Sequence, residues 1–350
     1  MQHYILYNPQ QTPIMKALLE KALSTHGYKA VSDLSQIADS EEYGLLIMSE
    51  LDWLGQDLYI SNALQAISKM KHVPFKKCGL IVFSEHYWFT KRYAQQMTFI
   101  LNQKGAFFPG QSLFEVLPEF ENLKTWQKHL KLPMDDVVQH RFSVYLEEWS
   151  QRGPLTFSKA TRKILVLHAS HYHVSNTLRL WEMVETHLQG WTIQRMGLQN
   201  GTITDCKGCA FKTCVHYAQS RSCYYGGQMT MEILPAIEES DVIVWVSPNY
   251  NDSLSAMHAA LINRLTVLYR RISLKDKAMY GVIVSGNSGC DSVACQLIGA
   301  LNINKGFYLP QHAFLTAIAN SPGSIEKLSG VQERAMAFAK QIDKNHPAGQ

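Results

Sequence analysis

The most informative stretch of the chain is SDVIVWVSPNYNDSLSAMHAALINRL, residues 240–265. Residues 241–247 form an apolar run rich in β-branched side chains, which predicts a buried strand because the run is too short for a buried helix. Turn-forming residues follow from Ser247 to Ser253, and from Leu254 onward apolar residues recur at helical spacing. The stretch therefore predicts a strand, a polar loop and a helix. In an open α/β sheet such a loop lies at the carboxyl end of its strand, where ligands bind.

The composition is that of a globular protein. Its 350 residues suggest about two domains, and 46% hydrophobic with 18% charged residues allows a sizeable core. The net charge of +4 is small and no basic run is interleaved with aromatic residues, so we expect no nucleic-acid partner. No apolar segment approaches the roughly 20 residues that span a bilayer. The N-terminus also lacks the pattern of a signal peptide, so we expect no membrane association and a cytoplasmic location.

Strand and helix patterns alternate along both halves of the chain, which predicts α/β domains whose parallel sheets carry helices on both faces. A polar stretch at Gln151–Pro154 marks the boundary, so we expect one domain over 1–150 and a second over 160–345. The predicted strands are 4–7, 43–48, 78–83 and 106–117 in the first half, and 163–167, 241–247, 280–285 and 308–310 in the second.

The two halves also resemble each other in detail. Residues 79–82, GLIV, match residues 281–284, GVIV, and residues 44–49 match 242–247. A Lys-Gly pair at 104–105 recurs at 305–306, and a proline follows at 109 and at 310. Matches in the same order favour a duplicated domain over two unrelated domains that merely share apolar strands.

The predicted loops of the second half carry small polar residues. After its first strand come Ser170, Ser175, Asn176 and Thr177, just before a helix. Hydroxyls and unpaired backbone N–H groups at a helix start favour an anion, and we expect this polar loop to be exposed. A further loop contains Ser285, Gly286, Asn287 and Ser288, where small residues let a ligand approach the backbone. The first half instead has Glu50 and bulky residues at the matching loops, and carboxylates repel a phosphate.

These loops resemble those of the flavodoxin-like NAD(P)H-dependent FMN oxidoreductases, a family that includes iron-sulfur flavoproteins. The family pattern S-P-x-Y matches Ser247–Tyr250, followed by a helix that closes on Asn263 and Arg264, with Asn263 where the family usually has Asp. The loop at 169–177 is similar to the family's phosphate loop, with Ala169 in place of the usual Gly and Tyr172 or His173 at the usual Arg position.

The resemblance implies two tandem flavodoxin-like domains, of which the second binds FMN and the first is a degenerate copy. It implies that Ser170, Ser175, Asn176 and Thr177 face the phosphate. Pro248, Asn249, Tyr250 and Asn251 would then face the flavin ring, and Ser285, Gly286, Asn287 and Ser288 would border it. The implied activity is electron transfer from NAD(P)H through FMN to a quinone, a nitro compound or another small acceptor. The flavin carries that chemistry, so no catalytic side chain is assigned.

Four of the seven cysteines lie close together in the sequence. Cys206, Cys209, Cys214 and Cys223 have the spacing C-x2-C-x4-C-x8-C. Thiolates this close could hold an iron–sulfur cluster or zinc, and they could equally be free or redox-active thiols. Iron-sulfur flavoproteins carry a compact cysteine motif in this region, so the resemblance implies the cluster as one alternative.

Two further functions remain open from the sequence. One is an electron carrier with an iron–sulfur cluster, and the other is a scaffold protein whose flavin site is vestigial. Flavodoxin-like FMN reductases commonly form dimers, so we expect either a homodimer or a pseudo-dimer in which the first domain takes the place of a neighbouring subunit. Trp53, Tyr87, Trp88 and Phe89 at its predicted loops are candidates for covering a flavin or for packing within their own domain.

Overall fold

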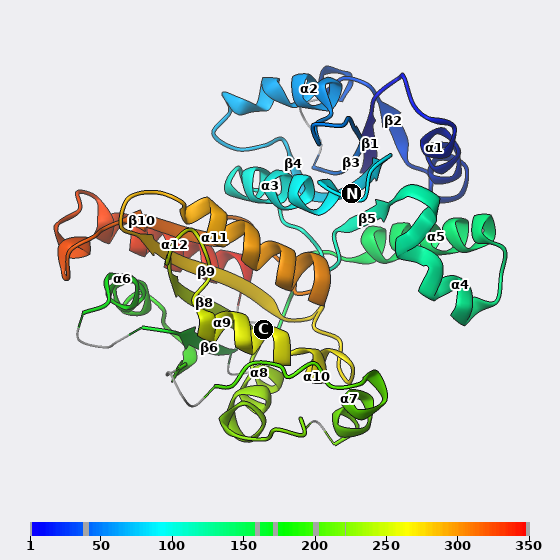
Figure 1. Ribbon diagram of the computed structural model, residues 1–350. Coiled ribbons are helices and arrows are strands. Elements are labelled where there is room, and N and C mark those ends of the chain that lie inside the picture. The colour runs from blue at the N-terminus through cyan, green and yellow to red at the C-terminus, as the bar shows by residue number, and fades with distance from the viewer. Residues whose placement is uncertain are drawn as a thin grey trace. The chain divides into compact units, whose positions relative to one another are not determined.

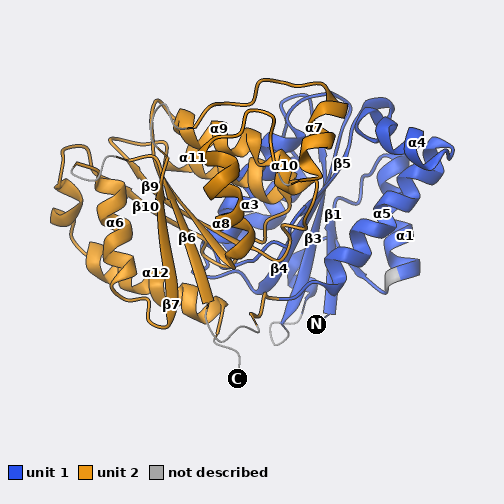
Figure 2. Cartoon of the chain, turned by 90° about the horizontal axis from the view of Figure 1, so that it is seen from below, with its two compact units in different colours: residues 1–153 blue, residues 154–350 orange. Residues whose placement is uncertain are grey.

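The computed structural model describes residues 2–37, 42–157, 162–170, 174–198, 203–220 and 222–347 (Figure 1). The chain divides into two compact units, Met1–Gly153 and Pro154–Gln350 (Figure 2). Residues 171–173, which include the positions compared with the family's phosphate arginine, lie outside the described residues. No helix in the described ranges is long and apolar enough to cross a bilayer.

Unit 1 contains a five-stranded parallel sheet with the order β2-β1-β3-β4-β5. Its strands are β1 (Gln2–Tyr7), β2 (Lys29–Val31), β3 (Tyr43–Leu51), β4 (Phe75–Ser84) and β5 (Leu113–Val116). Its helices are α1 (Pro13–His26), α2 (Leu58–Ser68), α3 (Thr90–Gln103), α4 (Lys124–Leu130) and α5 (Met134–Gln151), with short helical turns η1 (Leu34–Gln36) and η2 (Pro118–Leu123).

Unit 2 contains a second five-stranded parallel sheet with the order β10-β9-β8-β6-β7. Its strands are β6 (Arg162–His168), β7 (Trp191–Gly197), β8 (Val242–Pro248), β9 (Ala278–Ser285) and β10 (Phe314–Ile318). Its helices are α6 (Asn176–Glu185), α7 (Phe211–Ala218), α8 (Leu234–Glu239), α9 (Ala256–Arg264), α10 (Thr266–Tyr269), α11 (Cys290–Leu297) and α12 (Val331–Asn345). Two π-helical segments, η3 (Met229–Ile233) and η4 (Ile298–Lys305), and a short 3-10 helix, η5 (Ser324–Lys327), complete the unit.

The strand orders confirm the predicted fold class. Counted along each unit, both sheets run second-first-third-fourth-fifth, which is the flavodoxin-like order. In such a sheet the first and third strands are neighbours, and the chain reverses direction between them at the switch point where ligands bind. The sequence placed the last strand of unit 2 at 308–310. In the structure it is β10, while Tyr308 makes only an isolated bridge with Ala278.

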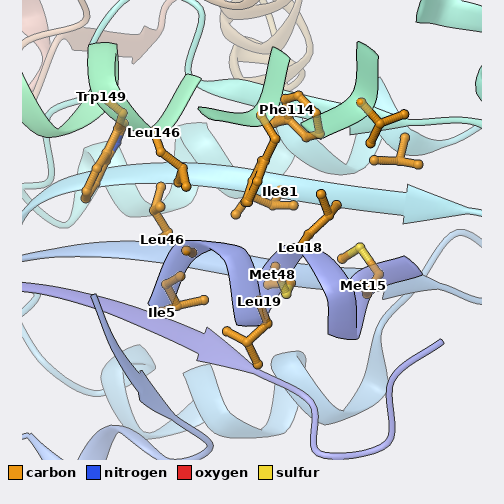
Figure 3. Packing of buried hydrophobic residues seen from close by; sticks show 14 of the residues in the cluster. Ile5, Met15, Leu18, Leu19, Leu46, Met48, Ile81, Phe114, Leu146 and Trp149 are labelled. Carbon is orange, nitrogen blue, oxygen red and sulfur yellow. The ribbon is translucent and has the colours of Figure 1, made fainter. Parts of the chain in front are cut away.

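One face of the sheet in unit 1 is covered by α1 and α5 (Figure 3). Met15, Leu18 and Leu19 of α1 occur at helical spacing and meet strand residues such as Ile5 and Leu46 (Figure 3). On the α5 side, Leu146 and Trp149 belong to the same cluster (Figure 3). Each fully buried side chain of this size contributes about 1.5–3 kcal/mol, so unit 1 has a core of its own.

The two units share irregular details that generic α/β domains need not share. Gly105 and Gly306 adopt φ angles of 100° and 85° after their helices. Asn102 Nδ2 donates to the carbonyl of Ala106 at 3.0 Å, and Asn302 Nδ2 donates to that of Phe307 at 2.7 Å. Non-glycine residues with positive φ follow in both units, Gln111 at 59° and His312 at 52°. Unit 1 is therefore a second copy of the same fold, as the repeated Lys-Gly motif predicted.

Candidate functional site

The loops at the carboxyl edge of the sheet in unit 2 line a cavity of about 340 Å³. The loops follow β6, β8, β9 and β10, so the cavity lies beside the switch point of the sheet. The predicted site residues that line it are Ser170, Ser175, Asn176, Thr177, Pro248, Asn249, Tyr250 and Gly286. The described residues of its wall carry no charged side chain.

The start of α6 forms one wall of the cavity. Ser175 is the N-cap, and its Oγ accepts a hydrogen bond from the backbone N–H of Leu178 at 3.1 Å. The N–H groups of Asn176 and Thr177 precede the first intrahelical bonds, so they and the positive end of the helix dipole are available to an anion. Ser170 Oγ is buried beside them and makes no hydrogen bond within the described part of the chain. The wall therefore offers several neutral donors to one ligand.

Asn176 has a different role from the one expected. It is 8% exposed, and its Nδ2 donates to the carbonyls of Ala319 at 3.1 Å and Ser321 at 2.8 Å. The amide thus ties the start of α6 to the loop after β10, which lines the same cavity through Ala319 and Asn320. The side chain of Asn176 is committed to holding the wall together, and only its backbone N–H remains for a ligand.

The loop after β8 is a tight turn. Tyr250 and Ser253 exchange backbone hydrogen bonds at 3.3 and 3.1 Å, and the two residues between them, Asn251 and Asp252, have φ angles of 52° and 58°. Two consecutive left-handed residues make a type I′ turn, for which Asn and Asp are suited. The turn directs Pro248, Asn249 and Tyr250 to the cavity wall, whereas Asn251 is exposed and is not part of the wall.

Of the residues predicted in the loop after β9, only Gly286 lines the cavity. A Cβ at Gly286 would come within 3.2 Å of Asn320 Oδ1. Ser285 is buried, and its Oγ lies 3.0 Å from Asn249 Nδ2 and 3.0 Å from Cys290 Sγ. Asn287 and Ser288 are exposed and not part of the wall, although the Ser288 carbonyl accepts a hydrogen bond from Asn249.

Sequence reasoning missed four residues of the wall: Val174, Val284, Ala319 and Asn320. Ala319 and Asn320 directly follow β10, and they were missed because the sequence analysis did not place a strand there. The turn-forming residues Asn320–Gly323 were the available signal, since they mark the end of that strand.

Two buried histidines lie outside the cavity lining on elements that lead to it, and burial lowers the pKa of both. Burial lowers the pKa of His258 to about 4, and its ring nitrogens face Ser255 Oγ at 3.0 Å and the Leu167 carbonyl at 3.2 Å. Burial also lowers the pKa of His168, which ends β6. An anion in this cavity would therefore rely on the helix start and the hydroxyls.

The corresponding edge of unit 1 is closed by its own carboxylate. The side chain of Glu50, at the end of β3, accepts a hydrogen bond from the backbone N–H of Thr12 through both oxygens, at 3.1 and 3.0 Å. Thr12 is the N-cap of α1, which has no side-chain cap and no acidic residue in its first turn. Burial raises the pKa of Glu50, and Asp57 and Glu85 act in the same direction, while the bond from Thr12 opposes them. Glu50 thus takes up the backbone N–H at the start of α1, where the matching helix start of unit 2 lines a cavity.

The four clustered cysteines lie away from these loops. All four are free and line one cavity of about 110 Å³, together with Tyr217, Tyr225 and Arg264. Arg264 is 3% exposed and donates to the carbonyls of Gly226 at 2.7 Å and Thr204 at 3.3 Å. Within the described ranges, no group of three or more His, Cys, Asp or Glu side chains is arranged to hold a metal ion.

Comparison with known proteins gives a family match in unit 2. Residues 162–321 match the family described as NADPH-dependent FMN reductase. No curated protein sequence matches the chain. A solved NAD(P)H:quinone oxidoreductase from Methanothermobacter marburgensis is 15% identical, with 52% of this chain and 96% of that chain covered and a TM-score of 0.40. An FMN-dependent NADH-azoreductase from Bacillus anthracis str. Ames Ancestor, solved in complex with FMN, is 12% identical, with 54% and 100% covered and a TM-score of 0.36.

The family match covers all five strands of the sheet in unit 2 and the loops after β6, β8 and β9. It agrees with the resemblance carried by Ser247–Tyr250 and by the loop at 169–177. Residues 162–321 of this chain belong to the NADPH-dependent FMN reductase family, an FMN-binding family of flavodoxin-like fold.

Proposed function

We propose that unit 2 binds FMN in the 340 Å³ cavity and passes electrons from NAD(P)H to a small-molecule acceptor such as a quinone or a nitro compound. The observation that carries the proposal is the meeting of the α6 start with the loops after β8 and β9 on one uncharged cavity, within the residues that match the family. When bound, FMN supplies hydride acceptance from the nicotinamide and electron delivery to the acceptor.

The residues present fit the two ends of FMN. A phosphate suits the start of α6, where the N–H groups of Asn176 and Thr177, the hydroxyl of Thr177 and the unpartnered hydroxyl of Ser170 lie on one wall. A flat ring suits the part of the wall formed by the loops after β8 and β9, because Pro248 is rigid and Gly286 has no side chain. Tyr250 is 55% exposed at this wall, so its ring is free to cover one face of a ligand.

The chain's own contribution is therefore positioning rather than acid–base catalysis. Burial lowers the pKa of both His168 and His258, and the described wall offers no carboxylate or amine to move a proton. Hydride transfer needs correct distance and orientation, which the loops supply by holding the cofactor against the sheet.

The proposal extends to unit 1 as the partner of the flavin domain. In unit 1, Glu50 already accepts the backbone N–H at the start of α1. Unit 1 therefore need not have been retained in evolution for binding a cofactor. Phe89 packs against Gly55 within unit 1, whereas Trp53, Tyr87 and Trp88 are more than half exposed. We propose that unit 1 takes the place of a neighbouring subunit, with a homodimer as the alternative assembly.

A second candidate function is an electron carrier that contains an iron–sulfur cluster. The observation behind it is that Cys206, Cys209, Cys214 and Cys223 line one cavity. In the described structure these thiols are not arranged as metal ligands, so a cluster would require them to move together. Iron and sulfide measurements on protein purified without oxygen separate the two functions. Flavin absorption alone favours the reductase, and an added broad absorption from iron–sulfur charge transfer favours the carrier.

The reductase is tested by titrating the full chain with FMN and then following oxidation of NADH and NADPH with a quinone. The variant Ser170→Ala with Thr177→Val should weaken FMN binding by about 1–3 kcal/mol, since hydrogen bonds to a charged group contribute about that much. The matched control Ser35→Ala lies on an exposed turn of unit 1 and should bind FMN like the wild type. A chain that binds no FMN, or a double variant with unchanged affinity, would contradict the assignment.

A further inference from the structure

The carboxamide of Asn249 is held in one orientation. Its Nδ2 lies 2.9 Å from the Ser288 carbonyl, 3.0 Å from Ser285 Oγ and 3.2 Å from Asp252 Oδ1. A carbonyl and a carboxylate can only accept hydrogen bonds, so the NH2 group must face them and the oxygen must face away. Rotating the amide by 180° would set its oxygen against two obligate acceptors. The orientation therefore follows from the chemistry of the neighbours.

The loop after β9 is shaped around this arrangement. Gly289 has a φ of 81°, and a Cβ on it would overlap Asp252 Oδ1 and come within 2.9 Å of Asn249 Nδ2. Gln296 of α11 braces the turn from the other side, since its Nε2 donates to the Asp252 carbonyl at 2.9 Å. The backbone N–H of Asn249 is fixed as well, because it donates to the Val284 carbonyl at 3.0 Å.

The oxygen of the same amide has no partner. Asn249 lines the cavity, yet its Oδ1 is shielded from bulk water and accepts no hydrogen bond from the described residues. A buried acceptor left unsatisfied is unfavourable and rare in folded proteins. Asn249 thus offers this cavity an unsatisfied acceptor, whereas the α6 start offers donors. An occupant that matches both carries an anionic group and a hydrogen-bond donor.

FMN has this polarity, and this inference rests on its proposed binding in the cavity. The oxidised isoalloxazine ring has a single N–H group, at N3, and its other polar ring atoms are acceptors. Further N–H groups, at N5 and N1, exist only after reduction. The donors present in both oxidation states are N3–H and the hydroxyls of the ribityl chain. Asn249 lies next to Pro248, on the wall assigned above to the ring, so there the donor is N3–H. We propose that Asn249 Oδ1 accepts a hydrogen bond from N3–H and makes the cavity selective for flavins that carry a proton at N3.

The test compares FMN with 3-methyl-FMN, which lacks that proton, in the full chain and in Asn249→Ala. We expect the wild type to bind FMN at least ~10-fold more tightly than 3-methyl-FMN, because a site built around a hydrogen bond rejects the analogue that cannot make it. Asn249→Ala should weaken FMN binding and bring the ratio of the two affinities close to one. Ser288→Ala keeps the backbone carbonyl that holds Asn249, so it should discriminate like the wild type.

A redox readout separates N3 from N5. N3–H is present in both oxidation states and donates at least as well in the oxidised one, so Asn249→Ala should not lower the midpoint potential of bound FMN. Loss of a contact to N5–H would lower it, because that group exists only in the reduced state. An unchanged affinity ratio in Asn249→Ala, or a fall in its midpoint potential, would overturn the assignment to N3–H. If Asn249→Ala does not fold, Asn249→Ser gives the same ratio, since its hydroxyl is too short to replace the amide oxygen. Wild-type protein that binds neither flavin would instead refute the proposed function.

Discussion

Replacing Asn176 by alanine should destabilise unit 2, and the size of the effect follows from its hydrogen bonds. Asn176 Nδ2 is the only donor to the Ala319 carbonyl among the described residues. Its loss in the variant leaves that oxygen without a partner, which costs about 1–3 kcal/mol. The bond to the Ser321 carbonyl contributes about 1 kcal/mol, because that oxygen keeps a second donor, the N–H of Ser324. Together these bonds predict a loss of about 3 kcal/mol in the free energy of unfolding of unit 2.

The assay is urea unfolding of the full chain combined with hydrogen exchange, which reports the two units separately. The matched variant is Ser175→Ala, which removes only the cap of α6 and should cost about 1 kcal/mol. Faster exchange at 319–325 in Asn176→Ala, without a change in unit 1, would support the reasoning. A stability within about 0.5 kcal/mol of the wild type would refute it, because surface substitutions have effects of that size.

Three other predictions concern Glu50, the cysteines and unit 1. Burial raises the pKa of Glu50, so the contribution of this side chain to stability is complete below its ordinary pKa of 4.5 and is lost as the pH rises through the raised value. In thermal unfolding, Glu50→Gln should therefore gain stability relative to the wild type as the pH rises above 4.5, and a difference that is constant with pH would contradict this. Cys206→Ser should change the free energy of unfolding by less than about 0.5 kcal/mol, since Cys206 is exposed, whereas a larger loss with release of iron or zinc would reveal a metal site. A fragment of residues 155–350 should bind FMN more weakly than the full chain if unit 1 replaces a neighbouring subunit, and full affinity and activity in the fragment would rule that out.

The central strands were predictable because buried parallel strands appear as continuous apolar runs. β8 and β9 are buried along almost their whole length, and the sequence placed both within about two residues. The edge strand β7 was not predicted, because its residues are mostly exposed or half-buried and its sequence, WTIQRMG, has no apolar run. β10 was predicted at the wrong residues, because an irregular segment precedes it in the chain. In that segment Tyr308 has the sequence character of a strand residue, but in the structure it forms only an isolated bridge.

The site was predictable where local chemistry determines the role of a residue. Ser175 follows the N-cap rule, and Pro248–Tyr250 follow a buried strand at the correct edge of the sheet. Asn176 was not predictable, because its partners lie about 145 residues away in the loop after β10. The orientation of Asn249 depends in the same way on Ser285 and Ser288, which reach it only through the pairing of β8 with β9.

Glu50 has a consequence for how each unit depends on the supply of cofactor. Because a tethered carboxylate accepts the N–H at the start of α1, the stability of unit 1 does not depend on the concentration of any dissolved anion. Unit 2, under the proposed function, gains stability only in proportion to the logarithm of free FMN over its dissociation constant. When FMN is scarce, the same polypeptide would therefore keep one half folded while the other becomes the first target of proteases. The abundance of the intact chain would then follow the cell's flavin supply, with no separate sensor.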